Sequence, residues 1–159
     1  MTDYDNLLAL LHKHTLLFEE LTGTEQAKLE AAKDYDIAKL ENCMKKEQAD
    51  TMVLRGYDKK RLALLDTLQF GNITFTQMIP QLPEEYRYEF SIEFDKLNDA
   101  YHLYRETADC AKQIIEINIH RLGIAIDELK KKTNTISGEV YTPEGMIVSD
   151  HFSFSDRKV

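Results

Sequence analysis

The stretch that decides the fold runs from Glu84 to Lys132 and reads EEYRYEFSIEFDKLNDAYHLYRETADCAKQIIEINIHRLGIAIDELKKK. It contains no Pro and a single Gly, Gly123, so nothing in it forces a helix to end. Its apolar residues recur alternately four and three residues apart, which is the 3.5-residue period of a coiled coil. These positions are Phe90, Phe94, Leu97, Tyr101, Tyr104, Ala108, Ala111, Ile115, Asn118, Leu122, Ala125 and Leu129. At 1.5 Å per residue such a helix is roughly 70 Å long, so it needs long helices beside it, from the same chain or another.

One position of this apolar stripe is polar. Asn118 stands between Ile115 and Leu122, where Ile or Leu is expected. A buried Asn costs stability but fixes the register and the partner of a helix, because misaligned pairing leaves its amide without a hydrogen bond. We expect Asn118 to have such a register or contact role; the alternative is a frayed edge where the amide meets water.

Composition restricts the classes of partner. The chain has 159 residues, enough for one domain with a core, and a net charge of −8. This charge argues against nucleic acid and anionic membrane surfaces as partners, because phosphate binding needs a basic surface. No hydrophobic run is long enough to insert stably in a membrane, and the acidic start Met1–Asp5 lacks the basic region of a signal peptide. We therefore expect a cytoplasmic protein.

The rest of the chain also has helical periodicity. A first helix is predicted from Thr2 or Asp3 to Lys33, with its inner positions at Leu7, Leu11, His14, Phe18 and Leu21. A break at Asp34–Asp36 is predicted, with one continuous helix as the alternative. A second helix is predicted from Ile37 to about Phe70. Its inner face is marked by Ile37, Leu40, Met44, Thr51, Leu54, Leu65 and Leu68, and the polar Glu47, Asp58 and Arg61 fall on the same face. Such a polar stretch indicates exposure to water or a partner of opposite charge.

A connector and a tail complete the predicted organisation. Ile73–Pro83 should form one or two helical turns, with Phe75, Met78 and Ile79 closing one end of the bundle. After Leu129 comes the polar linker Thr133–Gly138, and a short hairpin is predicted around Pro143 and Gly145. The prediction is thus an all-α fold: a long antiparallel helical hairpin or coiled-coil bundle over residues 1–132, with a short connector helix. Residues 133–159 form a C-terminal tail that binds a partner.

No catalytic or metal-binding pattern stands out. There is no Gly-rich phosphate loop, GxSxG or HExxH sequence. The nearest metal-type spacings are Asp99 with His102 and Glu116 with His120, which fall short of the two Glu-x-x-His motifs of a helical di-metal site. Cys43 and Cys110 belong to no CxxC motif, and we expect both to be small buried helix residues. We therefore predict no enzyme activity and no cofactor.

Three parts of the sequence resemble the FlgN-type flagellar export chaperones. The first is the leading amphipathic helix followed by Asp34-Tyr35-Asp36-Ile37-Ala38-Lys39-Leu40, and the second is Ile117-Asn118-Ile119-His120-Arg121-Leu122 in the last long helix. The third is Val140-Tyr141-Thr142-Pro143-Glu144-Gly145, which is similar to the Tyr-x-x-x-Gly element that follows the last helix in this family. The resemblance as a whole covers essentially the full chain.

The resemblance implies a chaperone without covalent chemistry. Its cargoes would be hook–filament junction proteins of the FlgK and FlgL type, kept soluble in the cytoplasm and delivered to the flagellar type III export gate. It implies that the C-terminal region recognises cargo and that Tyr141 docks on the cytosolic domain of the export gate, with Gly145 shaping the turn.

Apolar residues late in the chain are the candidates for cargo binding. Cargo helices that assemble into coiled coils can be covered by a matching helical surface. The candidate residues are Asn118, Ile119, Leu122, Ile126, Ile147 and Val148. For Ile115 and Leu122 an intramolecular core position is the better interpretation, because both lie on the main stripe. The alternative function is a structural coiled-coil scaffold that self-associates as a homo-oligomer without cargo.

Overall fold

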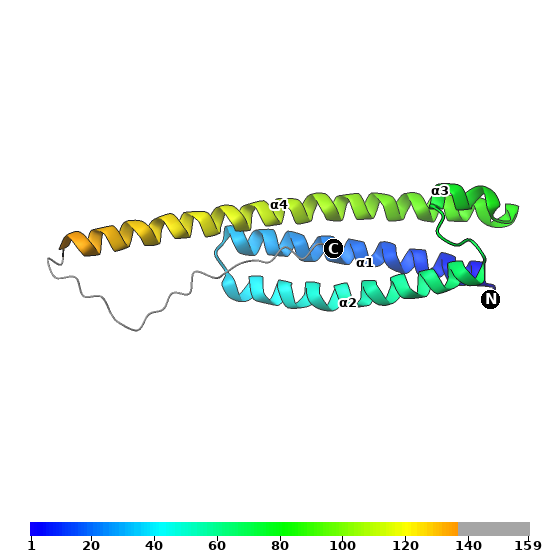
Figure 1. Cartoon of the computed structure of the whole chain (residues 1–159), viewed down its shortest axis with the longest axis horizontal. Helices are drawn as coiled ribbons and strands as arrows, with labels where there is room; N and C mark the ends of the chain where they lie inside the picture. The colour runs from blue at the N-terminus through cyan, green and yellow to red at the C-terminus, as the bar shows by residue number, and fades with distance from the viewer. Residues whose placement is uncertain (137–159) are drawn as a thin grey trace. The chain divides into compact units, whose positions relative to one another are not determined.

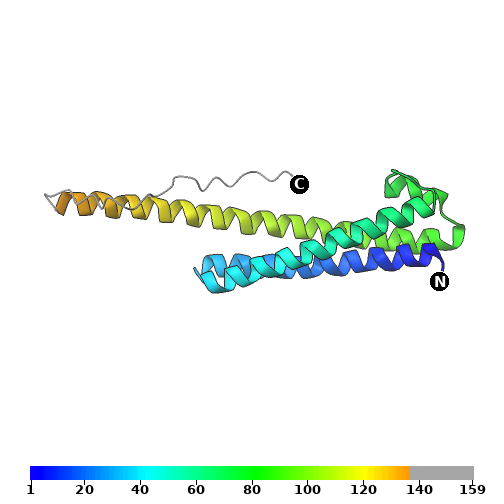
Figure 2. The ribbon, with the colours of Figure 1, turned by 60° about the horizontal axis from the view of Figure 1, so that its bottom comes forward.

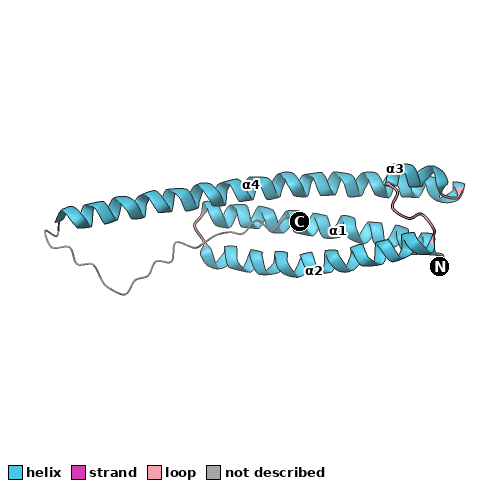
Figure 3. Cartoon of the chain, viewed as in Figure 1, coloured by secondary structure: helices cyan, strands magenta, loops and turns pink. Residues whose placement is uncertain are grey.

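The computed structural model describes residues 1–136, and all regular structure in this range is helical (Figure 3). The elements are α1 (Asp3–Lys33), α2 (Ile37–Thr67), α3 (Phe75–Met78), the 3₁₀ helix η1 (Ile79–Gln81) and α4 (Glu84–Ile136). Residues 1–120 form one compact unit, and a second unit begins at Arg121. The predicted all-α fold class is confirmed.

Side chains define where α1 and α2 begin. Thr2 and Asp5 form a capping box, in which the Asp5 N–H donates to Thr2 Oγ1 (3.1 Å) and the Thr2 N–H donates to Asp5 Oδ2 (2.7 Å). Asp36 Oδ1 accepts from the Lys39 N–H (3.0 Å) at the start of α2. Tyr35 lies between the helices with a φ of 54°, in the left-handed region that interrupts a right-handed helix. The predicted break is therefore confirmed, and the continuous-helix alternative is wrong.

Within residues 1–120, α1, α2 and the first part of α4 lie side by side (Figures 1 and 2). α1 and α2 form an antiparallel hairpin, whereas α4 runs parallel to α1. Two contacts between α1 and α4 show this parallel direction, because the paired residues are nearly the same number of positions apart at both ends of α1. The Tyr86 hydroxyl donates to Asp5, 81 residues away, and the Asn118 amide donates to the Ala32 carbonyl, 86 residues away. α1 and α4 thus share one register along the length of α1.

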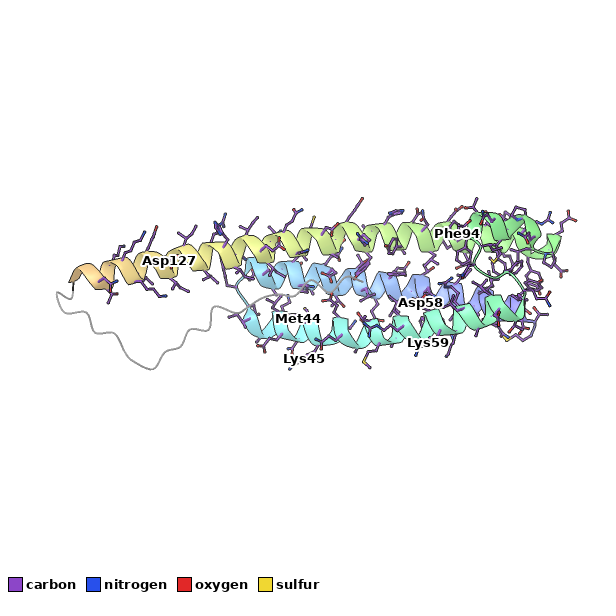
Figure 4. All side chains as sticks on the ribbon, in the orientation of Figure 1. Met44, Lys45, Asp58, Lys59, Phe94 and Asp127 are labelled. Carbon is purple, nitrogen blue, oxygen red and sulfur yellow. The ribbon has the colours of Figure 1, made fainter. Side chains whose placement is uncertain are left out.

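A hydrophobic core fills the end of the bundle where the connector lies; we call it the end core. It unites all the helical elements of residues 1–120 around Phe90, which is completely buried. Its buried members are Leu7, Leu11, Leu65, Phe70, Met78, Leu82 and Phe90. The connector contributes Met78, and Phe75 and Ile79 pack against the cluster from outside. Phe75 also stacks on Phe94 at 5.0 Å between ring centroids, close to α3 (Figure 4). The predicted end-closing role of the connector is confirmed.

A second cluster lies further along the bundle. Its buried members are Leu17, Phe18, Leu21 and Ala100. The Phe18 ring contacts the rings of Tyr101 and Tyr104 on α4 at 5.4 and 5.6 Å. All five predicted inner positions of the first helix are buried, including His14, whose Nδ1 donates to the Leu10 carbonyl (2.9 Å). The 3.5-residue period therefore identified the inner face of α1 correctly.

The predicted inner face of α2 is partly wrong. Ile37 and Met44 are exposed rather than inward-facing, and Met52 on the same helix is exposed as well. Cys43, which precedes Met44 in the sequence, is buried instead. The reason is that the polar residues Glu47 and Asp50 occupy part of the inner face, so apolarity is a poor guide to orientation on this helix.

Three further expectations differ from the structure. α2 ends at Thr67, because Gln69 and Gly71 adopt left-handed backbone conformations (φ 61° and 60°) that stop the helix before Phe70. α4 continues to Ile136, into the segment predicted to be a linker from Thr133, which contains no Pro or Gly before position 138. Cys110, expected to be buried, is exposed, because it lies off the buried stripe that includes Ala111.

We predict that Phe90→Ala lowers the free energy of unfolding by roughly 3–5 kcal/mol, since it opens a cavity in the end core. Tyr88→Ala is the matched control, because Tyr88 lies two residues away on the same helix and is mostly exposed. It should change stability by less than about 0.5 kcal/mol. Chemical denaturation followed by circular dichroism measures both, and equal effects would contradict the packing described.

Candidate interaction surface on helix α4

The C-terminal part of α4 exposes large apolar side chains. Every residue from 121 to 134 is exposed. Leu122, Ile126 and Leu129 are 54%, 50% and 63% exposed, and their spacing of four and three residues places them on one side of the helix. Ile124, also exposed, points to a different side. We call Leu122, Ile126 and Leu129 the α4 apolar face.

Helix lengths account for the exposure of this face within residues 1–136. α4 has 53 residues, whereas α1 and α2 have 31 each. At 1.5 Å per residue, α4 is about 80 Å long and each of the others about 46 Å. Neither can pair with the whole of α4. The stripe period continues unchanged from Ala111, which is fully buried, to Leu129, so the same pattern encodes core at one position and surface at another.

Exposed apolar surface of this kind usually marks a binding site. Covering half of a Leu or Ile side chain contributes roughly 1 kcal/mol, so the three residues together can supply a useful part of a micromolar affinity. Leu122, interpreted from its position on the stripe as a core residue, is exposed, and that interpretation is wrong. Ile119 and Ile126, predicted to contact a partner, are exposed as that role requires.

Asn118 is half-buried and already has a partner within the chain. Its Nδ2 donates to the Ala32 carbonyl at 2.7 Å. Ala32 lies in the last turn of α1, and its carbonyl also accepts from the Tyr35 N–H at 3.4 Å. The bond therefore fixes α4 against the end of α1, which supports the predicted register role. The frayed-edge alternative does not hold, because the amide is hydrogen-bonded to protein.

A partly buried ionic cluster joins the two helices of the α1–α2 hairpin. Lys28 Nζ lies 2.8 Å from Glu47 Oε2 and 3.2 Å from Glu25 Oε2, and Glu25 is only 1% exposed. Burial raises the pKa of Glu25; Lys28 opposes this shift, and Glu47 adds to it. Burial acts to lower the pKa of Lys28, but the hydrogen bonds and charges of Glu47 and Glu25 raise it on balance. Burial and these carboxylates also raise the pKa of Tyr104 on α4. Glu47, one of the polar residues predicted on the inner face of α2, thus has a partner of opposite charge.

Several predicted site residues lie outside the described residues. This group contains Tyr141, Gly145, Ile147, Val148 and the predicted hairpin. Sequence reasoning placed Leu129 on the stripe but did not propose it as a binding residue. The signal was available: its position follows Leu122 by seven residues, so any partner that covers Leu122 and Ile126 also meets Leu129.

Neither a metal site nor a membrane span occurs in residues 1–136. No three His, Cys, Asp or Glu side chains in this range gather closely enough to hold a metal ion. None of the helices in the same range combines the length and hydropathy that crossing a bilayer requires.

The fold and the α4 apolar face define the class: a bundle of long helices with an exposed helical surface suited to a protein partner. A family model described as FlgN protein matches residues 1–149 of the 159-residue chain. The chain therefore belongs to the FlgN family, and the resemblance found in the sequence is confirmed. FlgN is a family of flagellar export chaperones rather than of enzymes, and its members bind flagellar hook-associated proteins. No curated protein and no solved structure matches the chain.

We predict that Asn118→Ala costs about 1 kcal/mol of stability, the usual net contribution of one hydrogen bond between protein groups. Asn98→Ala is the control, because Asn98 is an exposed residue of the same helix. Thermal denaturation at neutral pH compares the two. If both variants melt together with the parent chain, the bond to Ala32 has no role in fixing register.

The raised pKa of Glu25 predicts a specific pH dependence. In the folded protein the Glu25 carboxylate takes up its proton at a higher pH than in the unfolded chain, where the pKa of this group is near 4.5. As pH falls from 7 towards 4.5, the parent chain should gain stability relative to Glu25→Gln, which has no proton to bind. Urea denaturation of both proteins across this range measures the difference, and a constant difference would contradict the pKa assignment.

Proposed function

We propose that this chain is a cytoplasmic chaperone for hook–filament junction proteins of the FlgK and FlgL type, which it holds soluble and delivers to the flagellar export gate. The observation that supports this most is the α4 apolar face, since Leu122, Ile126 and Leu129 are at least half exposed in a protein of a chaperone family. Junction proteins assemble through coiled-coil helices, and such a helix fits an exposed stripe of the same 3.5-residue period.

Cargo binding is proposed to involve Ile119, Leu122, Ile126 and Leu129 on α4, with Ile147 and Val148 in the C-terminal tail. A cargo helix lying along the apolar face would bury these side chains and leave the charged residues of the segment at its border. Asn118 would act indirectly, since its amide already bonds to Ala32 and holds α4 in place. Cargo release then requires no covalent reaction, only a surface at the export gate that competes with the chaperone for the cargo.

Docking on the cytosolic domain of the export gate is proposed for Tyr141, with Gly145 shaping the turn that presents it. The support is the match of Val140–Gly145 to the family's tail element and the family match itself, which includes this segment. Cargo and gate would thus meet different parts of the C-terminal region, so the chaperone can hold one while it contacts the other.

We predict that Ile126→Asp reduces the yield of a co-purified junction protein from the same organism at least tenfold. The reason is that the variant removes apolar contact area and places a charge in the interface. Met52→Asp is the matched control, since Met52 is an exposed apolar residue on α2. Both variants should fold as the parent does.

A chain truncated after Lys132 distinguishes cargo contacts on α4 from cargo contacts in the tail. Weakened binding would place part of the cargo site in the tail, and unchanged binding would place it wholly on α4. If neither junction protein co-purifies with the intact chain, the proposed cargo is wrong, and a self-associating scaffold accounts for the exposed face better.

A further inference from the structure

A groove lies between α1 and α4 within residues 1–120. It has a volume of about 400 Å³ and opens to solvent. We call its apolar lining residues, Leu8, Ala9 and Ile92, the floor, and its polar lining residues, Asp5, His12, Glu89 and Glu93, the rim. Glu93 contacts Lys96 at 3.0 Å and His12 Nδ1 at 3.3 Å, so Asp5 and Glu89 give the rim its net negative charge.

The spacing of the lining residues suits a helical occupant. Residues 5, 9 and 12 follow one side of α1, and residues 89, 92 and 93 follow the facing side of α4. The α1 part spans two helical turns, about 11 Å. Leu16, four residues after His12, is half exposed and continues the same side of α1. An amphipathic helix with an apolar stripe about two turns long and basic residues beside it would complement this groove.

One segment of this chain has that chemistry. The stripe from Leu122 to Leu129 is also about 11 Å long. Residues 121–132 contain the basic Arg121, Lys130, Lys131 and Lys132 against the acidic Asp127 and Glu128, whereas the whole chain has a net charge of −8. This local basic excess matches the acidic rim, and the apolar face matches the floor.

We propose that two copies of this chain associate when the α4 apolar face of one copy, Leu122–Leu129, docks into the α1–α4 groove of the other. The contact covers the apolar face whenever cargo is absent, which protects the protein from non-specific aggregation. Where the proposed cargo function holds, cargo and a second copy compete for the same face, and cargo binding dissociates the pair.

The test measures association of the chain alone, so its failure leaves the cargo proposal untouched. Sedimentation equilibrium over a range of concentrations gives the dissociation constant. Glu89→Lys alters the rim, and Ile126→Lys alters the face; each should raise that constant about tenfold. The matched controls are Glu41→Lys and Met52→Lys, exposed residues of α2, which should leave it unchanged. Higher salt should weaken association of the parent chain.

Mixing the two altered chains makes the test sharper. The Ile126→Lys chain keeps an intact groove, and the Glu89→Lys chain keeps an intact face, so their mixture should associate more tightly than either variant alone. A variant that merely unfolds would not be rescued in this way. The proposal is overturned by a parent chain that stays monomeric, by a mixture no tighter than its components, or by Glu89→Lys weakening cargo binding while self-association is unchanged. The last result would make a cargo helix the occupant of the groove.

Discussion

The structure depends on one mismatch of lengths. A helix can bury its apolar stripe only against a neighbour that runs beside it, and α4 has 53 residues where α1 and α2 have 31 each. The sequence nevertheless keeps the 3.5-residue period from Phe90 to Leu129. One part of that stripe therefore forms the core of a bundle, and another part is apolar surface that is exposed within residues 1–136.

Polar groups set the register that makes this division reproducible. Apolar helices alone can slide past one another by a turn at little cost, whereas a buried amide or carboxylate loses its partners when they do. Asn118 holds α4 to the end of α1, and the cluster of Glu25, Lys28 and Glu47 holds α1 to α2. These contacts help to decide which residues of α4 are buried within residues 1–120.

Periodicity predicted most of this fold from the sequence. It identified the three long helices, the inner face of α1 and the break at Asp36, because apolar spacing and capping chemistry act locally. It failed on α2, where Met44 is exposed beside the buried Cys43, since an ionic cluster supplies the inner contacts there. It also failed to separate core from surface along α4. Leu122 and Ala111 lie on the same stripe, and only the ends of the neighbouring helices tell them apart.

Hydrogen–deuterium exchange of the chain with and without a junction protein from its own organism tests the central claim most directly. The account predicts that the cargo slows exchange of the backbone amides of residues 119–132, because a bound helix covers the α4 apolar face and suppresses local opening. Amides of α2 around Met44 and Met52 should exchange as before. A complex that leaves residues 119–132 unprotected, or that protects the exposed side of α2 instead, would contradict it.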